Sequence, residues 1–164
     1  MADALVQVSA RAPLEIVQVA AFADAAMAAR LSNHFGLTIT ATPNRAATDG
    51  DLTVLWHGPG QWLIVRAPAA TPLADELAML CGEDAAVVDL GHARTVLRLA
   101  GPAVRDALAR GTSIDLRPGR FGSGACALTA LGKIGALLHA LAPKTIDVYV
   151  ARSYAQALVD WLAH

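Results

Sequence analysis

The chain has 164 residues and a mass of 17.0 kDa, which suits one compact body and leaves no room for several independent domains. Apolar residues make up 55% of the chain and charged residues only 16%, against about 25% in a typical soluble domain. The net charge of −1, with no basic segment, argues against a nucleic-acid-binding protein, and no apolar stretch reaches the ~18 residues that a membrane-spanning helix needs.

The first half of the chain alternates strand and helix patterns. Residues 1–12 show no sustained period and are expected to form an N-terminal arm. Residues 14–20 are rich in β-branched side chains, which predicts a strand. Apolar residues then recur at helical spacing between Asp24 and Gly36, and a glycine is typical of a helix end.

A hairpin and a second helix follow. Residues 52–57 and 62–66 have strand patterns on either side of Gly58-Pro59-Gly60, a sequence typical of a tight turn. A proline, two early acidic residues and a leucine stripe predict a helix over residues 72–82. A short strand is expected over residues 85–90.

The same order returns in the second half. Residues 94–100 alternate as a half-buried strand does, and a helix is expected within Gly101–Gly111. The remaining strands are expected over residues 125–131, 134–141 and 146–151. Ser153 and Gln156 have the spacing of a capping box and predict a final helix with Tyr154 on its buried side.

An internal repeat organises the chain. The segment Gly36–Arg45 matches Gly111–Arg120 at a constant offset, with identical glycine, isoleucine, proline and arginine. Because the same elements flank both segments, we infer a duplicated β-α-β-β-α unit. The predicted fold class is α+β, with helices packed on antiparallel sheets. We expect residues 13–164 to form a single compact domain of two pseudo-repeats, about 14–90 and 91–164.

Few residues offer reactive chemistry. The five histidines have no partners at metal-ligand spacing, and the glycine-rich segment 119–124 lacks a P-loop lysine and precedes a strand. A nucleophile and base pair that includes Cys126 stays open, although its alanine neighbours favour a space-filling role. We expect no catalytic, cofactor-binding or metal-binding residue in this chain.

The cysteines and the N-terminus indicate a compartment. Cys81 and Cys126 lie apart in apolar surroundings, which is typical of reduced, buried thiols. The N-terminus lacks the pattern of a signal peptide. We therefore expect a cytoplasmic protein.

The shortage of charge predicts a surface that another chain partly covers, because obligate interfaces resemble a domain core; an alanine-rich genome is the alternative. Trp56 and Trp62 flank the first hairpin turn and are either core residues or aromatic anchors of an interface. Asp89, His92 and Arg94 lie within six residues. They either bind an anion or a partner carboxylate, or pin the junction between the two halves.

A set of short motifs lies in colinear order between Pro43 and Leu162. They are Pro43-Asn44-Arg45, Leu55-Trp56-His57-Gly58-Pro59 with Trp62-Leu63, His92-Ala93-Arg94-Thr95, Leu99-Ala100-Gly101-Pro102, Gly124-Ala125-Cys126, Leu131-Gly132-Lys133, Tyr149-Val150-Ala151-Arg152-Ser153-Tyr154-Ala155 and Trp161-Leu162. In these motifs the chain resembles the γ subunit of heterotetrameric sarcosine oxidase. Asp89-Leu90-Gly91-His92 and Gly101-Pro102 are more distantly similar to the folate-binding domain of the glycine-cleavage aminomethyltransferase.

The resemblance implies a noncatalytic subunit of a complex that demethylates sarcosine to glycine and passes the one-carbon unit to tetrahydrofolate. It implies that FAD, FMN, NAD and tetrahydrofolate belong to partner subunits, with the α subunit as the main contact and β and δ subunits also present. A stand-alone folate-binding or aminomethyltransferase-like protein and a homodimeric scaffold stay open as alternatives. The candidate interface or junction residues are Arg45, Trp56, Trp62, His92, Arg94, Arg120 and Arg152.

Overall fold

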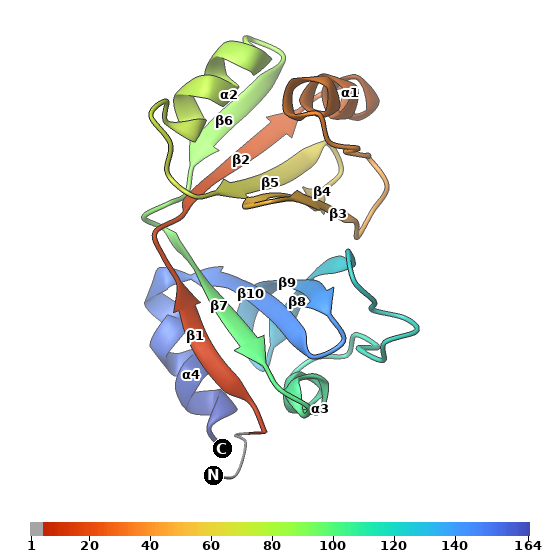
Figure 1. Ribbon diagram of the computed structural model, residues 1–164, viewed down its shortest axis with the longest axis vertical. Coiled ribbons are helices and arrows are strands. Elements are labelled where there is room, and N and C mark those ends of the chain that lie inside the picture. The colour runs from red at the N-terminus through yellow and green to blue at the C-terminus, as the bar shows by residue number, and fades with distance from the viewer. Residues whose placement is uncertain (1–4) are drawn as a thin grey trace. The chain divides into compact units, whose positions relative to one another are not determined.

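The computed structural model describes residues 5–164, which divide into two compact units (Figure 1). The continuous unit is Pro13–His92, and the discontinuous unit joins Met1–Ala12 to Ala93–His164. Each unit has one five-stranded sheet with two α-helices packed on one of its faces. This confirms the predicted α+β class, and the unit boundaries lie close to those of the predicted repeats. The arrangement of both repeats as a single compact domain stays a prediction.

The continuous unit has the sheet order β3-β4-β5-β2-β6, with all neighbours antiparallel. Its elements are β2 (Glu15–Ala21), α1 (Asp24–Phe35), β3 (Ala46–Asp49), β4 (Leu52–Gly58), β5 (Gln61–Arg66), α2 (Leu73–Cys81) and β6 (Ala85–Asp89). Leu31 of α1 and Leu77 of α2 pack with Val19 and Ile64 in one buried cluster. Because alternate strand residues share a face, the apolar residues on one side of this sheet all meet the two helices.

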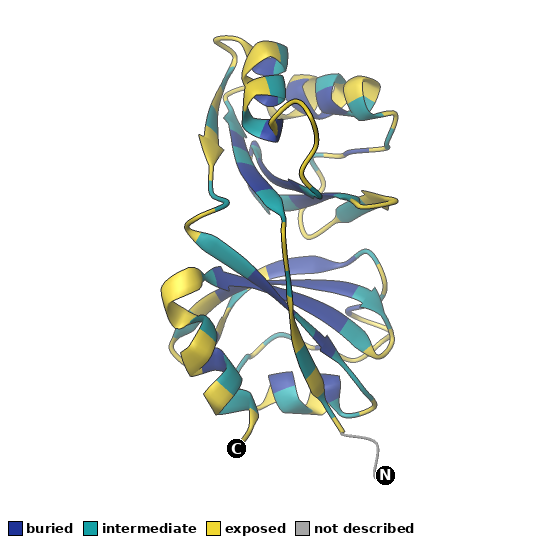
Figure 2. Cartoon of the chain, turned by 60° about the vertical axis from the view of Figure 1, so that its left-hand side comes forward, coloured by how far each residue is buried: buried dark blue, intermediate teal, exposed yellow. Residues whose placement is uncertain are grey.

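The discontinuous unit has the sheet order β1-β7-β10-β9-β8, again antiparallel throughout. Its elements are β1 (Gln7–Arg11), β7 (Arg94–Ala100), α3 (Val104–Ala109), β8 (Cys126–Leu131), β9 (Ile134–Ala142), β10 (Thr145–Ala151), the 3₁₀ turn η1 (Arg152–Tyr154) and α4 (Ala155–Leu162). Leu99, Leu138 and Val148 pack with Leu108 of α3 and Leu158 of α4. Figure 2 shows this distribution, with buried residues along the strands and exposed residues on the outward sides of the helices.

The two sheets have the same plan. Strands β7, β10, β9 and β8 of one unit take the positions of β2, β5, β4 and β3 of the other. Only the fifth strand comes from a different place in the chain, since β6 follows the rest of its unit and β1 precedes both repeats. The shared order supports the duplication that the sequence indicates.

The expected N-terminal arm is instead an edge strand over most of its described length. Gln7–Arg11 pairs with β7, with Val8 opposite Leu99, and Val6 and Val8 pack against the core of the discontinuous unit. Residues 1–4 of the predicted arm lie outside the described residues. The strand was missed because only two apolar side chains alternate in this segment, which is too short a pattern to predict a strand.

Two other local predictions were wrong. Strand β3 was not expected, because its four residues, two of them alanine, have weak strand preference. The capping box was also wrong: α4 has Tyr154 as its N-cap with no side-chain cap, and Gln156 Nε2 instead donates to Asp160 Oδ1 at 2.8 Å. The chain leaves β10 directly into the 3₁₀ turn, so α4 begins two residues after the predicted cap at Ser153, and Tyr154 is exposed.

Gly111 follows the end of α3, and close packing against Trp161 requires a glycine at this position. A Cβ atom at this position would lie 2.6 Å from Cη2 of Trp161, which is closer than van der Waals contact allows. The Trp161 ring lies over this glycine while the guanidinium of Arg110 sits 5.5 Å from the ring centroid. The glycine therefore lets α4 pack closely against the end of α3.

Candidate functional site

A row of polar side chains crosses the helix-free face of the sheet in the discontinuous unit. Strand register places Cys126 beside His139 and His139 beside Asp147. Arg98 of β7 is the next residue along this row. Because successive strand residues point to opposite faces and neighbours such as Leu138 belong to the helix-covered core, these four residues share the other face. We call them the polar row.

Asp147 is the charged centre of the polar row and is fully buried. Arg98 binds it with two hydrogen bonds, from Nε to Oδ1 at 2.8 Å and from Nη2 to Oδ2 at 2.9 Å. Arg11 of β1 adds a third, from Nη1 to Oδ2 at 3.0 Å. The arginine side chains are 36% and 25% exposed, so only the carboxylate is removed from water. Two guanidinium groups thus satisfy the oxygens of this carboxylate inside the fold.

His139 and Tyr149 lie next to this carboxylate on the same face. Nδ1 of His139 and the hydroxyl of Tyr149 are buried and make no hydrogen bond with any residue in the range 5–164. Burial lowers the pKa of His139 to about 4; the charge of Asp147 acts against this shift, and those of Arg11 and Arg98 add to it. Burial raises the pKa of Tyr149. Both side chains are therefore neutral at neutral pH.

Cysteine, histidine and aspartate follow one another along the polar row, which are the residue types of an activated thiol nucleophile. The surroundings do not suit that chemistry. The Asp147 oxygens are bound by arginines, and the depressed pKa makes His139 a weak base. The Cys126 thiol is fully buried, whereas a nucleophile must be reached by its substrate. The row is best explained as a polar network that fixes strand register.

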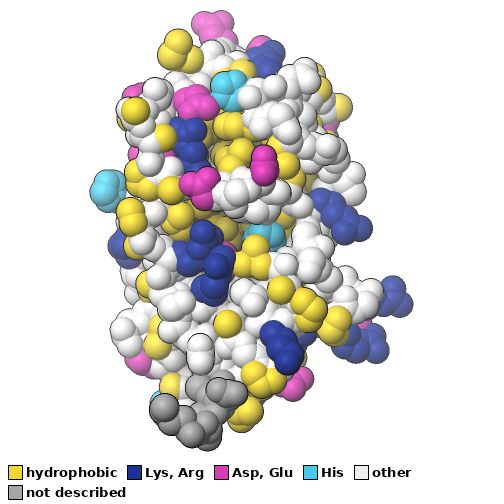
Figure 3. Space-filling view, viewed as in Figure 1, with side chains coloured by type: hydrophobic (Ala, Val, Ile, Leu, Met, Phe, Trp, Pro, Cys, Tyr) yellow, Lys and Arg dark blue, Asp and Glu magenta, His cyan; other side chains and the backbone are white. Residues whose placement is uncertain are grey.

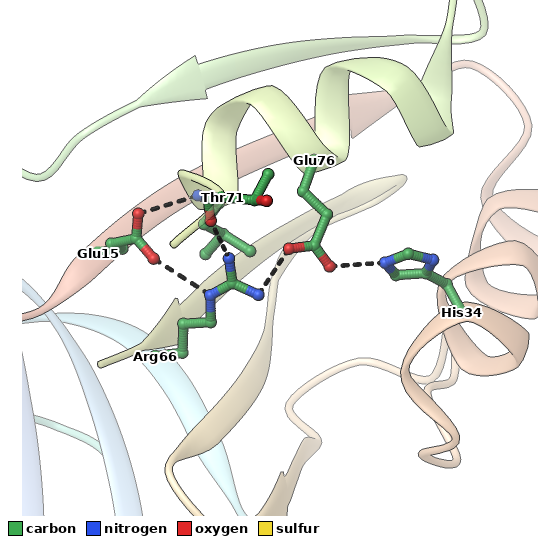
Figure 4. Close-up of polar contacts among 6 residues, drawn as sticks. Glu15, His34, Arg66, Thr71 and Glu76 are labelled. Atoms are coloured by element: carbon green, nitrogen blue, oxygen red, sulfur yellow. Dashed lines mark hydrogen bonds and ion pairs between the residues drawn. The ribbon is translucent and has the colours of Figure 1, made fainter. Parts of the chain in front are cut away.

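A second network joins both helices of the continuous unit to its sheet (Figure 4). Arg66 of β5 donates from Nε to Glu15 Oε2 at 3.1 Å, and its Nη1 lies 2.6 Å from Glu76 Oε2. Glu76 of α2 also lies 2.7 Å from Nε2 of His34 on α1. Glu15 Oε1 accepts from the backbone N–H of Leu73, the first residue of α2, at 2.9 Å. This network fixes the two helices against β2 and β5.

We expect Glu76→Gln to lower the free energy of unfolding by about 1–2 kcal/mol at pH 7, because the carboxylate holds both His34 and Arg66. Burial acts to raise the pKa of Glu76, but the hydrogen bonds and charges of His34 and Arg66 outweigh it and lower the pKa. The ionised carboxylate therefore stabilises the fold above its ordinary pKa of 4.5, and this contribution is lost as the pH falls further.

Chemical denaturation at pH 7 and at pH 3 tests this expectation. The Glu76→Gln variant should be less stable than the parent at pH 7 and nearly equal to it at pH 3. Asp75→Asn changes an exposed carboxylate in the same helical turn and is the matched control. A destabilisation of Glu76→Gln that is the same at both pH values would contradict the assignment.

Arg45, Trp56 and Trp62 lie in the continuous unit. Trp62 is 1% exposed within the helix-covered core and donates from Nε1 to the carbonyl oxygen of Thr40 at 3.1 Å. Trp56 lies opposite Trp62 in the β4–β5 register and is half-buried. Arg45 is exposed at the start of β3 and lines a cavity together with Trp62. The structure thus places Trp62 in the core and not at the surface, where an aromatic anchor of an interface would lie.

Of the other four predicted residues, Arg94, Arg120 and Arg152 lie in the discontinuous unit and His92 lies at the end of the continuous one. His92 is the last residue of the continuous unit, so the chain passes between units directly before Ala93. Arg152 donates its backbone N–H to the carbonyl oxygen of Ala93 at 2.9 Å and Nη2 to that of Arg94 at 3.1 Å. Arg94 and Arg152 are therefore brought together, whereas Arg120 lies in an exposed loop.

Sequence reasoning missed the residues that hold the polar row together. Asp147 carried a signal, since it is a lone carboxylate within an apolar strand, and such a group is rarely buried without a partner. Arg98 had a weaker sequence signal, because the alternation of polar and apolar residues in β7 placed it on the polar face. Nothing in the sequence linked Arg11 to either residue, since that contact depends on β1 being a strand of this sheet.

Several large apolar side chains reach the surface, although the sequence patterns did not indicate which ones. Figure 3 shows one face of the molecule, on which apolar side chains lie beside charged ones. Phe22 is 99% exposed and Met79 is 86% exposed. Within residues 5–164 the exposed large apolar residues are Leu5, Phe22, Met79, Val88, Leu128 and Tyr154. Exposed apolar groups of this size are typical of protein interaction surfaces when they lie together.

Clusters of metal ligands and membrane-spanning helices are both absent from the described part of the chain. Residues 5–164 contain no group of three or more histidine, cysteine, aspartate or glutamate side chains that is able to hold a metal ion. None of the helices in this range has the length and apolar character required to cross a membrane. Cys81 and Cys126 are both buried thiols that are not joined in a disulfide.

Comparison with known sequences gives a consistent set of relatives. Residues 19–164 match the family described as "Sarcosine oxidase, gamma subunit family". The chain is 37% identical over 110 residues to a sarcosine oxidase subunit gamma from Arthrobacter sp, covering 66% of this chain and 54% of that protein. It is 32% identical over 136 residues to the subunit gamma of Corynebacterium sp. (strain U-96), covering 82% of this chain and 66% of that protein. The chain thus spans about half to two thirds of the length of these curated relatives.

Solved structures extend the comparison. The chain is similar to a chain of the heterotetrameric sarcosine oxidase from Corynebacterium sp. U-96 in complex with pyrrole 2-carboxylate, with a TM-score of 0.86 and 28% identity, covering 96% of this chain and 81% of that one. It is also similar to the glycine cleavage system aminomethyltransferase T from Bartonella henselae, with a TM-score of 0.67 and 15% identity, covering 97% of this chain and 45% of that one. The second likeness concerns the fold alone.

Proposed function

Because the chain belongs to the sarcosine oxidase gamma subunit family, we propose that it is the gamma subunit of a heterotetrameric sarcosine oxidase. The observation that carries the proposal is the TM-score of 0.86 to a chain of such an assembly over 96% of this chain. The family resemblance seen in the short sequence motifs is confirmed by the match over residues 19–164.

The proposed role is noncatalytic. The chain supports the oxidative demethylation of sarcosine to glycine, while FAD, FMN, NAD and tetrahydrofolate, which takes up the one-carbon unit, are held by partner subunits. The arrangement of the polar row supports this role, because its carboxylate is bound by the chain's own arginines and its thiol is buried. The complex works in the cytoplasm.

The main partner is the α subunit, with the β and δ subunits completing the assembly. The candidate contact residues that are at least partly exposed are Arg45, Trp56, His92, Arg94, Arg120 and Arg152. The low share of charged residues and the exposed Phe22 and Met79 support a surface that a partner covers.

Co-expression with the partner chains tests the proposal. We expect the tagged chain to co-elute with the α, β and δ subunits at micromolar concentration, and with α when β and δ are left out. Arg120→Glu reverses an exposed candidate contact and should reduce the recovered α subunit roughly tenfold, because reversing a charge at an interface creates repulsion. Lys133→Glu reverses another exposed cation and is the matched control. Elution of the parent chain alone, with all partners present, would refute the assembly.

A stand-alone folate-binding protein is the second candidate, favoured by the fold likeness to aminomethyltransferase T. Isothermal titration of the isolated chain with tetrahydrofolate discriminates between the two. Binding in the micromolar range without partners would favour the stand-alone function, and no heat would count against it. Light scattering of the same sample tests the homodimeric scaffold, which requires twice the monomer mass.

A further inference from the structure

A cavity of about 310 Å³ opens on the continuous unit between the segment that follows α1 and strands β3, β4 and β5. Buried Val54 and Trp62 contribute its apolar floor. Its exposed rim carries three threonines and one arginine, which are Thr38, Thr40, Thr42 and Arg45. This size is at the lower end of ligand pockets, so it suits a small molecule.

The rim is held in place by the chain itself. Ser32 Oγ accepts from the backbone N–H of Ile39 at 2.9 Å and lies 3.0 Å from the Ile39 carbonyl oxygen. The Trp62 indole donates to the carbonyl oxygen of Thr40 at 3.1 Å. These contacts tie the threonine segment to α1 and to the floor of the cavity. The backbone that carries the threonines is therefore fixed before a ligand binds, which lowers the entropy cost of binding.

Arg45 gives the cavity a positive charge. It follows Asn44, whose φ of 62° lies in the left-handed region, and its carbonyl oxygen accepts from the Trp56 N–H at 3.0 Å. It is the sole charged residue among the lining residues of this cavity. Arg45 forms no ion pair with any residue between 5 and 164. The local charge therefore favours an anion.

The matching loop of the other unit contains a carboxylate, which the loop at the cavity lacks. At the constant offset of the repeat, Asp115 and Arg117 take the places of Thr40 and Thr42. Arg117 Nε donates to Asp115 Oδ1 at 2.8 Å, and these hydrogen bonds together with the charge of Arg120 lower the pKa of Asp115 to about 2. That loop thus stabilises a carboxylate of its own, whereas the loop at the cavity has the arginine and no carboxylate.

We propose that this cavity binds a small carboxylate with a flat apolar body. The carboxylate of the ligand lies at the Arg45 guanidinium and accepts hydrogen bonds from the threonine hydroxyls. It takes the part that the Asp115 carboxylate has in the matching loop. The apolar body packs on the half-buried Ala46 and Ala47, which line the cavity together with Val54 and Trp62. The site lies wholly in the continuous unit, and because Arg45 is also a candidate contact residue, binding is tested on the chain without its partners.

Titration of the full ¹⁵N-labelled chain with benzoate tests the site by nuclear magnetic resonance. We expect saturable shifts at the backbone amides of residues 38–47 and at the Trp62 indole N–H, with a Kd of about 1 mM, as suits so small a ligand. Arg45→Gln should weaken binding at least fivefold. Arg117→Gln removes the arginine that is already paired with Asp115 and is the matched control, with unchanged binding expected.

Benzamide, which has the same ring and no charge, separates recognition of the carboxylate from burial of the ring. It should bind at least fivefold more weakly than benzoate. Equal binding of the two probes, equal binding by Arg45→Gln, shifts outside the cavity, or no shifts at 20-fold excess over the expected Kd would each overturn the proposal. None of these results bears on co-elution with the α subunit, so the two proposals fail separately.

Discussion

Replacing Asp147 with asparagine is expected to lower the free energy of unfolding by about 3 kcal/mol, because the change removes one partner of a buried ion pair and leaves the other in place. Asp147 is fully buried and accepts three hydrogen bonds from Arg98 and Arg11. The asparagine keeps the shape but loses the charge and one acceptor. Two guanidinium groups then face each other on adjoining strands without a carboxylate between them.

Urea denaturation followed by circular dichroism measures the loss, and hydrogen exchange by mass spectrometry locates it. Exchange should rise in β1, β7 and β10 and stay unchanged in the continuous unit. Asp115→Asn breaks an exposed ion pair with Arg117 and should have little effect. If Asp147→Asn were as stable as the parent, the carboxylate would not be needed to balance the arginines.

Lowering the pH from 7 to 4 is expected to remove about 3 kcal/mol of stability through His139 alone. The imidazole is 2% exposed, and burial lowers its pKa to about 4 from an ordinary value of 6.5. Below pH 6.5 the unfolded chain binds a proton at this residue and the folded chain does not. The stabilisation is therefore complete above pH 6.5 and is lost as the pH falls toward 4.

The variant His139→Gln cannot bind this proton, so its stability should change less between pH 7 and pH 4 than that of the parent. Denaturation at half-unit steps of pH gives the two curves, and their difference isolates the histidine. His164→Gln, at an exposed histidine in the same unit, is the matched control and should follow the parent curve. Parallel curves for His139→Gln and the parent would show that the imidazole is protonated in the folded chain or exposed to water.

Much of the fold was predictable because its signals are local. The hairpin of β4 and β5 follows from the sequence Gly58-Pro59-Gly60 between two apolar runs, and α1 ends at Gly36 with φ of 64°, as its pattern indicates. The repeat was visible because a ten-residue match had the same elements on both sides. Strand β1 was not predictable, since its pairing partner β7 lies far along the chain.

The polar row was harder to predict because it depends on register. His139 and Asp147 face each other only because the turn between β9 and β10 sets that pairing, with a shift between Thr145 and Ile146. A slip by one residue would move each polar side chain into the helix-covered core. Sequence patterns give the face of each residue within its own strand, but they do not give which residues lie side by side across strands.

The split origin of the discontinuous unit bears on how the protein is made. Strand β1 is synthesised before the whole of Pro13–His92, and its partner β7 is synthesised after that unit. The continuous unit is complete at that point and can fold while Val6 and Val8 still lack their core. Because β1 and β7 lie far apart in the chain, we expect their pairing to form after the local hairpin of β9 and β10.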